Sequence, residues 1–290
     1  MLTLFTCPKP FIGHIRIIQR NAIQSWLAQK NGFEIILIGE DDGIAETASE
    51  FGLIHIPKVE CNEYGTPLIN SIFALAQERA INELLCYINA DILLLDDLIG
   101  VIKKISLPDF LMVGRRWDLD VFESINFGDN SWKDSISDLI KKKGILQIPN
   151  AIDYFIFKRG SIKQLPSFAV GRPGWDNWVI YNSWKKGIPI IDATESLTVV
   201  HQNHGYSHVP KHSGFMWEGP EAQKNRELMG VVKNYRFSIL DATHVLKTDG
   251  LKRAYTEPYL RRKWKRIPLF YPWIYPLHRL INGLLRKVLK

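Results

Sequence analysis

The 290-residue sequence predicts an α/β fold, a doubly wound and mostly parallel β-sheet, followed by a basic amphipathic helical extension at the C-terminus. Three observations predict it. Apolar runs of strand length alternate with helical periods up to residue 88. The strand runs are continuously apolar, as is typical of parallel strands buried on both faces. The last 40 residues hold eleven lysine and arginine residues against one acid, so the basic charge is concentrated at one end.

The first 88 residues predict four strands joined by three helices. We expect this β-α-β order to form parallel strands with right-handed crossovers. Thr66, just before the third helix, is a plausible N-cap. The expected strands cover residues 2–6, 33–38, 53–56 and 84–88, and the expected helices 15–28, 43–51 and 67–80.

The second half is less regular. Histidine, glycine and proline without a period predict a long loop over residues 201–220, and such loops are usually functional. We expect one domain over residues 1–220, divided near residue 113, and an extension over 221–290. The expected strands here cover residues 110–113, 153–157, 188–191 and 197–200, and the expected helices 97–105, 132–142 and 175–185.

Composition excludes several classes of protein. A hydrophobic content of 46% and a charged content of 23% indicate a soluble globular protein. No apolar run approaches the roughly 20 residues of a membrane span, and a strand at residues 2–6 leaves no room for a signal peptide. Cys7, Cys61 and Cys86 have unrelated spacings, so we expect neither disulfides nor a zinc site, and a cytoplasmic location.

Two nucleotide-binding motifs are absent after the first strand, where Thr6-Cys7-Pro8-Lys9-Pro10 stands. Neither Gly-x-Gly-x-x-Gly nor Gly-x-x-x-x-Gly-Lys-Ser/Thr occurs there. A nicotinamide-dependent dehydrogenase and a P-loop NTPase are therefore poor fits.

Polar residues follow the expected strands at the edge where ligands bind in open α/β sheets. Thr6 ends the first strand and Asp41 follows the second, where a carboxylate either accepts hydrogen bonds from a nucleotide or caps the next helix. Thr66 opens the third helix, where free N–H groups favour a polar ligand, although ordinary capping explains it equally well. Asn89-Ala90-Asp91 follows the fourth strand, where a carboxylate is placed to hold a divalent cation against a phosphate.

The Asn89-Ala90-Asp91 triplet resembles the Asp-x-Asp motif of glycosyltransferases with the type A (GT-A) fold, with asparagine in the first acidic position. The resemblance implies that Asp91 binds Mn²⁺ or Mg²⁺, which bridges the diphosphate of a UDP- or GDP-sugar donor. It implies that Asn89 contacts the ribose or a metal-bound water. The alternative is a simple turn at the end of a strand.

Gly174-Trp175-Asp176-Asn177-Trp178 places an acid between two tryptophans at the expected start of a helix. Indole rings stack on sugars, so Trp175 is a candidate donor contact. In inverting enzymes of the same fold, an acid at such a helix start deprotonates the acceptor hydroxyl, which assigns Asp176 as catalytic base. The alternative is an acid that stabilises the helix dipole.

Three histidines, His201, His204 and His208, follow the last expected strand. A late histidine completes the metal shell in several GT-A enzymes, and His201 is the first choice, with His204 second. A structural role remains open for each. In Gly114-Arg115-Arg116-Trp117-Asp118, the arginines, Arg115 first, either bind the diphosphate or pair with surface acids. Asp153 is a candidate for the acceptor pocket.

The resemblance implies a metal-dependent glycosyltransferase that moves a sugar to an acceptor hydroxyl with inversion at the anomeric carbon. The basic tail points to an envelope or lipid-linked glycan as the acceptor. Residues 1–113 then bind the nucleotide-sugar and residues 114–220 the acceptor. The alternative is a catalytically inactive, membrane-associated binding or scaffold protein, because the first acidic position of the triplet is asparagine.

The tail has its own pattern. A basic cluster over residues 261–266 and an aromatic run over 270–275 precede apolar residues at helical spacing from 277 to 288. This composition predicts an interfacial anchor at an anionic membrane, peripheral at the inner face of the plasma membrane. Packing on the protein's own domain or on a second subunit is the alternative. The other 250 residues hold 26 basic and 29 acidic groups, which argues against nucleic acid as partner.

Overall fold

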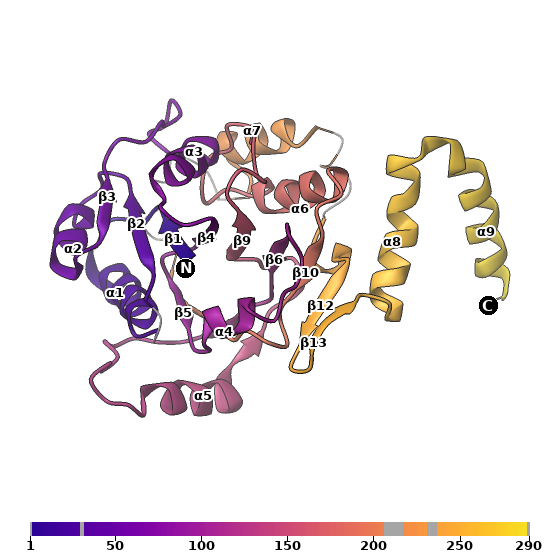
Figure 1. The fold of residues 1–290 in the computed structure, drawn as a ribbon. Coiled ribbons are helices and arrows are strands. Elements are labelled where there is room, and N and C mark those ends of the chain that lie inside the picture. Colours follow the sequence, from indigo (N-terminus) through magenta and orange to yellow (C-terminus); the bar gives the residue numbers. More distant parts are fainter. Residues whose placement is uncertain (1, 30–31, 206–216, 231, 233–236, 289–290) are drawn as a thin grey trace.

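The computed structural model describes residues 2–29, 32–205, 217–230, 232 and 237–288, and only the backbone of residues 284–288. His208 and most of the expected 201–220 loop lie outside the described residues. Within them, a sheet of nine strands runs in the order β13-β12-β10-β6-β9-β4-β1-β2-β3, and a smaller sheet runs β5-β11-β7-β8 (Figure 1). The architecture is α/β and the large sheet is mostly parallel, as predicted.

The N-terminal half of the large sheet confirms the sequence prediction. Neighbouring strands among β1, β2, β3 and β4 pair in parallel. The strands are β1 (Leu2–Thr6), β2 (Glu34–Ile38), β3 (Ile54–Ile56) and β4 (Leu84–Ile88), and the helices between them are α1 (Gly13–Leu27), α2 (Ile44–Phe51) and α3 (Ile69–Arg79).

The predicted start of α3 is wrong. The N-cap is Leu68 and no side chain caps the helix, so Thr66 does not have that role. Pro67 and Leu68 are extended instead and form isolated bridges to Cys61 and Ala169. Their backbone groups are therefore used in strand-like pairing rather than in a first helical turn.

The second half of the large sheet contains one reversed strand. β9 (Tyr154–Lys158) lies between β4 and β6 (Leu111–Val113) and is antiparallel to both. β10 (Ile190–Asp192), β12 (His244–Lys247) and β13 (Gly250–Arg253) then extend the sheet. The sheet therefore continues past residue 220, the expected boundary of the extension.

The smaller sheet consists mostly of strands too short for a period to show in the sequence. β5 (Ile92–Leu94) pairs antiparallel with β11 (Val199–Gln202), which pairs in parallel with β7 (Trp117–Leu119), and β7 pairs with β8 (Ile145–Leu146). α5 (Trp132–Lys143) covers this sheet with Trp132, Ile136 and Ile140. The sheet brings residues near 91, 118 and 201 together.

Apolar clusters cover both faces of the large sheet. On one face, α3 and α6 (Trp175–Lys185) pack on aromatic residues that include Phe5, Tyr87 and Phe157. On the other, α1, α2 and α4 (Leu98–Ile102) contribute residues such as Trp26 and Leu98. Burial of strands on both faces explains their continuous apolar sequence.

Helices dominate the C-terminal part. α7 (Pro220–Leu228) and the 3₁₀ turn η3 (Ile239–Asp241) precede β12, and α8 (Glu257–Phe270), the 3₁₀ turn η4 (Pro272–Ile274) and α9 (Tyr275–Val288) follow β13. In Figure 1, α8 and α9 stand as an antiparallel pair beside the β12–β13 edge. None of the helices in the described part of the chain is long and apolar enough to cross a bilayer.

A buried ion pair joins α7 to the segment before α6. Arg172 Nη2 lies 2.5 Å from Glu221 Oε2, and Glu221 Oε1 accepts a hydrogen bond of 2.7 Å from Asn62. The Asn62 side chain also accepts from the Thr66 amide. Thr66 is thus part of a network that holds three segments together.

Glu221→Ala is expected to lower the free energy of unfolding by about 3–5 kcal/mol, because it leaves the Arg172 charge largely buried without its partner. Urea denaturation measures the change. Glu227→Ala, on the exposed side of the same helix, is the matched control and is expected to have little effect. Equal losses in the two variants would contradict a structural role for the ion pair.

Candidate functional site

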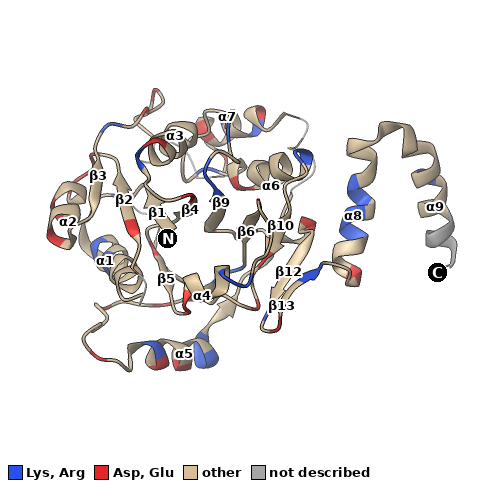
Figure 2. Ribbon diagram, in the orientation of Figure 1, with Lys and Arg blue, Asp and Glu red and all other residues tan. Residues whose placement is uncertain are grey.

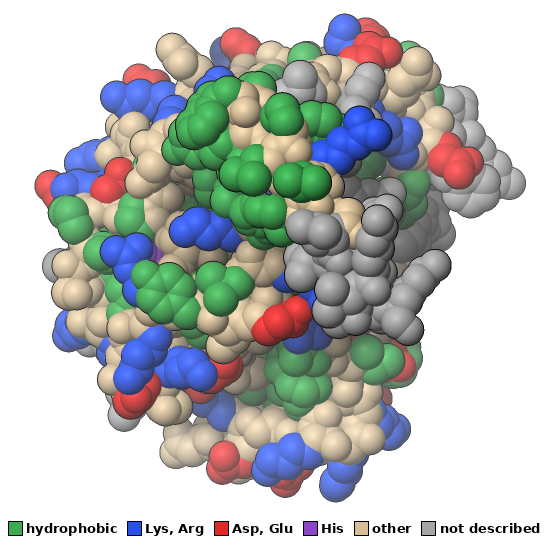
Figure 3. Space-filling model, turned by 90° about the vertical axis from the view of Figure 1, so that its right-hand side faces the viewer, with side chains coloured by type: hydrophobic (Ala, Val, Ile, Leu, Met, Phe, Trp, Pro, Cys, Tyr) green, Lys and Arg blue, Asp and Glu red, His purple; other side chains and the backbone are tan. Residues whose placement is uncertain are grey.

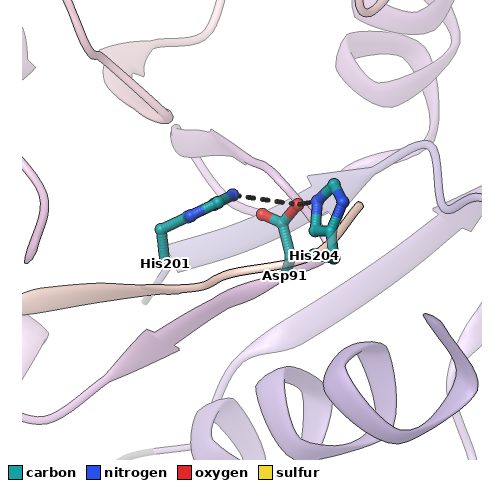
Figure 4. Close-up of side chains that lie close together, drawn as sticks. All are labelled: Asp91, His201 and His204. Atoms are coloured by element: carbon teal, nitrogen blue, oxygen red, sulfur yellow. Dashed lines mark hydrogen bonds and ion pairs between the residues drawn. The ribbon is translucent and has the colours of Figure 1, made fainter. Parts of the chain in front are cut away.

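Three side chains converge where β4 passes into β5. Asp91 lies between these strands, and His201 on β11 pairs in register with Ile92. Asp91 Oδ2 lies 3.0 Å from His204 Nε2 and 3.7 Å from His201 Nε2. Figure 4 shows both imidazoles directed at the same carboxylate. The predicted Asp91–His201 pair is therefore brought together, and His204, the second choice, joins it.

The site holds its carboxylate in the ionised form. Asp91 is only 9% exposed, and burial alone would raise its pKa. His201, the hydrogen bond from His204 and the nearby Lys9 outweigh burial and lower the pKa of Asp91 well below its usual range. Asp91 Oδ1 is buried and has no hydrogen-bond partner among the described residues. A buried, ionised and unpartnered carboxylate oxygen is an available ligand atom.

The donor set suits a divalent cation. The ligand atoms of Asp91, His201 and His204 all lie within 4.8 Å of one another. In octahedral coordination with bonds of about 2.1 Å, adjacent ligand atoms lie about 3 Å apart and opposite ones about 4.2 Å. The distances from Asp91 Oδ2 to the two imidazoles, 3.0 Å and 3.7 Å, fall in this range. One carboxylate and two imidazoles favour Mn²⁺ over Mg²⁺, which prefers oxygen.

A second layer of charge surrounds the three residues. Arg116 donates to Asp153 at 2.6 Å and to Asp118 at 2.8 Å. Asp118 Oδ1 in turn lies 3.4 Å from His201 Nδ1. Asn89 donates a hydrogen bond of 2.6 Å to the other oxygen of Asp153. Asn89 and Arg116 thus fix Asp153 from two sides.

Arg115 is placed differently from the prediction. Its guanidinium donates to the backbone carbonyls of Gln147 and Leu146. Arg115 therefore binds the backbone at the end of β8. Its neighbour Arg116 is the arginine that belongs to the charged layer. Alternation of side chains along an extended segment sends the two arginines to opposite sides.

Asp176 lies in the first turn of α6, as predicted. Burial raises the pKa of its carboxyl to about 6, backbone N–H groups at the helix start act in the opposite direction, and the negative charge of Asp153 raises it further. The charge of Asp153 thus acts on Asp176 as well as on Lys9 and His201.

Trp175 is part of the core. It is 6% exposed, and its ring centroid lies 4.9 Å from that of Phe155 and 5.1 Å from that of Tyr87. The prediction that this indole stacks on a sugar is not supported by its position. Trp175 thus anchors the start of α6 in the core, and Asp176 follows it at a half-buried position.

The other predicted donor contacts lie at strand ends. Thr6 is buried at the end of β1, and its hydroxyl has no hydrogen-bond partner within the described part of the chain. Asp41 follows β2 and is exposed. Burial of part of the carboxyl, together with Asp42 and Glu40, raises the pKa of Asp41.

Lys9 is a site residue that sequence reasoning missed. Its ammonium nitrogen lies 3.3 Å from His204 Nε2, and burial lowers its pKa although Asp91 and Asp153 oppose this. The segment that follows β1 lacks the glycine motifs that mark phosphate-binding loops. Its one basic residue, at the ligand-binding edge of the sheet, was the available signal.

The fold is similar to solved glycosyltransferase structures. It superimposes on S. aureus TarS 1–349 in complex with UDP-GlcNAc with a TM-score of 0.50 and 9% identity over 95% of this chain and 73% of that one. A mannosyltransferase from Pyrobaculum calidifontis in complex with GDP-Man and Mn²⁺ gives 0.45 and 13% over 71% and 58%. Glucosyl-3-phosphoglycerate synthase from Mycobacterium tuberculosis, with Mn²⁺, UDP and phosphoglyceric acid, gives 0.45 and 11% over 80% and 79%.

This chain spans 58% of the length of the mannosyltransferase. No protein-family model and no curated protein sequence matches it. The similarity to TarS extends over nearly the whole chain at very low identity, so it establishes the architecture. The chain has the GT-A fold of nucleotide-sugar glycosyltransferases.

Proposed function

We propose that this protein is a metal-dependent glycosyltransferase that transfers a sugar from a nucleoside-diphosphate-sugar to an acceptor hydroxyl. The observation that carries the proposal is the convergence of Asp91, His201 and His204 at the ligand-binding edge of a GT-A sheet. TarS, which has the same fold, was solved with UDP-GlcNAc. The donor of this chain is a UDP- or GDP-sugar.

Asp91, His201 and His204 are the residues that would hold Mn²⁺ or Mg²⁺. When bound, the cation neutralises charge on the departing nucleoside diphosphate. Lys9 brings a further positive charge to the same place, 3.3 Å from His204, and is suited to an oxygen of the diphosphate. Asp118 orients His201 from its far side, as outer carboxylates commonly do for histidine ligands.

Asp176 acts as the general base. A carboxyl with a pKa of about 6 is mostly ionised at pH 7 and still basic enough to accept a proton. It takes the proton of the acceptor hydroxyl while that oxygen bonds to the anomeric carbon and the bond from carbon to diphosphate breaks. Attack from the side opposite the leaving group inverts the anomeric configuration.

The remaining donor contacts follow from the strand ends. Thr6 ends β1 and Asp41 follows β2, where they suit the base and the ribose of the donor. Thr66 precedes α3 and Asn89 follows β4, and we assign both as further donor contacts. Residues 1–113 form the nucleotide-sugar half of a catalytic domain, and the acceptor half begins at residue 114. Because β12 and β13 belong to the large sheet, the acceptor half continues past residue 220, and only α8 and α9 form the extension. In place of Arg115 and Trp175, whose side chains are engaged elsewhere, we assign Arg116 to the charged layer of the site.

We also propose that the acceptor is an envelope or lipid-linked glycan, met at the inner face of the plasma membrane. The support is the charge of the tail, which holds eleven of the 37 basic residues of the chain. An anionic leaflet attracts such a segment by about 1 kcal/mol for each basic residue near the surface.

Thermal denaturation with and without Mn²⁺ tests the function. Among UDP- and GDP-sugars, we expect one donor to raise the melting temperature strongly with Mn²⁺ and weakly without it. A ligand at 100 times its dissociation constant stabilises the folded state by about 2.7 kcal/mol. If no donor stabilises the protein in a metal-dependent way, the transferase is refuted. The alternative, an inactive binding or scaffold protein with asparagine at position 89, is then favoured.

A further inference from the structure

The C-terminal helical pair has an unusual orientation. α8 lies against the catalytic domain, and α9 lies beyond α8, on the side away from the sheet (Figure 1). Amphipathic helices of globular proteins normally turn their apolar stripe to the core. In this pair, α8 contacts polar side chains of α9.

Trp264 of α8 makes those contacts. Its ring lies 4.8 Å from that of His278, and its indole N–H donates a hydrogen bond of 3.0 Å to Asn282. Successive residues of an α-helix are rotated by about 100°, so Leu280 lies on nearly the opposite side of α9 from His278 and Asn282. The polar side of α9 is therefore turned toward the protein.

Part of the apolar side of α9 is turned outward, while Ile281 is half-buried. Leu277 is 56% exposed and Leu280 is 61% exposed. At the turn between the helices, Trp273 is 77% exposed, with Tyr271 and Tyr275 exposed beside it. In Figure 3, which faces this end of the molecule, hydrophobic side chains form a continuous patch with lysine and arginine side chains near its margin.

The pair is attached to the domain through α8. Asp241, buried at the end of η3, accepts hydrogen bonds of 3.0 Å from both Arg262 and Arg266. The Arg266 guanidinium lies 4.4 Å from the Phe237 ring centroid, and Phe270 packs on Trp184 at 4.1 Å between ring centroids. These contacts hold α8 in one orientation on the domain. Because α9 follows α8, they also fix α9 on the outer side of the pair.

The attachment divides the basic residues of α8 into two groups. Arg262 and Arg266 are used in the contact with Asp241, while Arg261, Lys263 and Lys265 are exposed, as is Arg279 on α9. Figure 2 shows the basic segment along α8. A helical pair that carries both exposed basic side chains and exposed leucine, tryptophan and tyrosine matches an anionic lipid surface, since aromatic rings with a polar end favour the membrane interface.

We propose that the exposed apolar side of α9 and the η4 turn, defined by Leu277, Leu280 and Trp273, dock into an anionic bilayer surface while α8 holds the catalytic domain. This deepens the membrane association within the proposed function and does not depend on the transfer chemistry. A second copy is a poorer occupant, because a symmetric dimer on this face would bring like charges together.

Co-sedimentation of the full chain with vesicles tests this inference. The wild type is expected to bind vesicles of phosphatidylcholine with phosphatidylglycerol, and to bind phosphatidylcholine alone much less. Leu277→Glu/Leu280→Glu is expected to weaken binding more than about tenfold, because each substitution puts a charge where an apolar side chain would be buried in the bilayer surface. Leu27→Glu/Ile81→Glu, which changes two exposed apolar residues elsewhere, is the matched control and is expected to bind like the wild type.

The charge is tested with Lys263→Glu/Lys265→Glu, which is expected to remove the preference for anionic vesicles. Equal binding by the leucine variant and the wild type would overturn the proposal. So would a wild type that binds no vesicles but is a dimer by light scattering and becomes a monomer in the leucine variant. Donor binding with Mn²⁺, measured on the same proteins without lipid, is expected to stay unchanged; loss of it in every protein, with vesicle binding retained, refutes the transferase alone.

Discussion

Asp91→Asn is expected to abolish metal-stimulated hydrolysis and transfer of the donor sugar. The substitution keeps the size of the side chain but removes the charge on which His201 and His204 converge. Loss of one preorganised electrostatic contact in an active site commonly costs about 10²–10³-fold in rate, and loss of the cation's only carboxylate ligand among these three residues is expected to cost at least this. Release of nucleoside diphosphate, measured while Mn²⁺ is titrated, gives both the rate and the metal dependence.

Asp138→Asn is the control for this prediction, because Asp138 is an exposed carboxylate on α5. It is expected to leave the rate and the metal dependence unchanged. An Asp91→Asn protein that still responds to Mn²⁺ like the wild type would remove Asp91 from the metal site and with it the proposed role of the histidines.

Asp176→Asn is expected to bind the donor normally and to lose transfer by about 10²–10⁴-fold, the usual contribution of a general base. Donor affinity, measured calorimetrically with Mn²⁺, and the single-turnover rate separate binding from chemistry. Wild-type transfer by this variant would remove Asp176 as the base. In the wild type, kcat/KM is expected to fall as the pH drops below about 6, because the base must be ionised.

The raised pKa of Asp176 also predicts how stability depends on pH, in the direction opposite to activity. Because burial raises its pKa to about 6, the folded protein keeps a proton between about pH 4 and 6 that the unfolded chain releases. The contribution of Asp176 to stability therefore falls as pH rises through this window and stays low above it. Asp176→Asn is expected to be at least as stable as the wild type at pH 7, and a large fall in its melting temperature would indicate a structural role instead.

The first half of the fold was predictable because its strands are long, apolar and separated by helices of clear period. β1, β4 and α6 have the predicted bounds. The errors lie where tertiary contacts override local signals. Pro67 and Leu68 resemble a helix start but pair with Cys61 and Ala169. β9 is reversed between two neighbours that run parallel to each other, and nothing in the four-residue apolar run of 154–157 shows its direction.

The site was predictable in its centre and not in its surroundings. Asp91 and His201 follow apolar runs that the sequence locates, although the structure places Asp91 just before β5 and His201 inside β11. The side chains that surround Asp91 and Asp153 are brought together by the strands β5 and β7. Each of these strands is three residues long, which is too short for a period of apolar residues to show in the sequence. For that reason the choice between Arg115 and Arg116, and the burial of Trp175, followed only from the three-dimensional arrangement.

The central claim is that Asp91, His201 and His204 bind the cation that holds the donor. Anomalous diffraction from a crystal grown with Mn²⁺ and the nucleoside diphosphate of the stabilising donor tests it most directly. We expect one manganese peak within coordination distance of Asp91, His201 and His204, next to the diphosphate oxygens. A bound nucleotide with no manganese at these three residues, or manganese held elsewhere, would contradict the account.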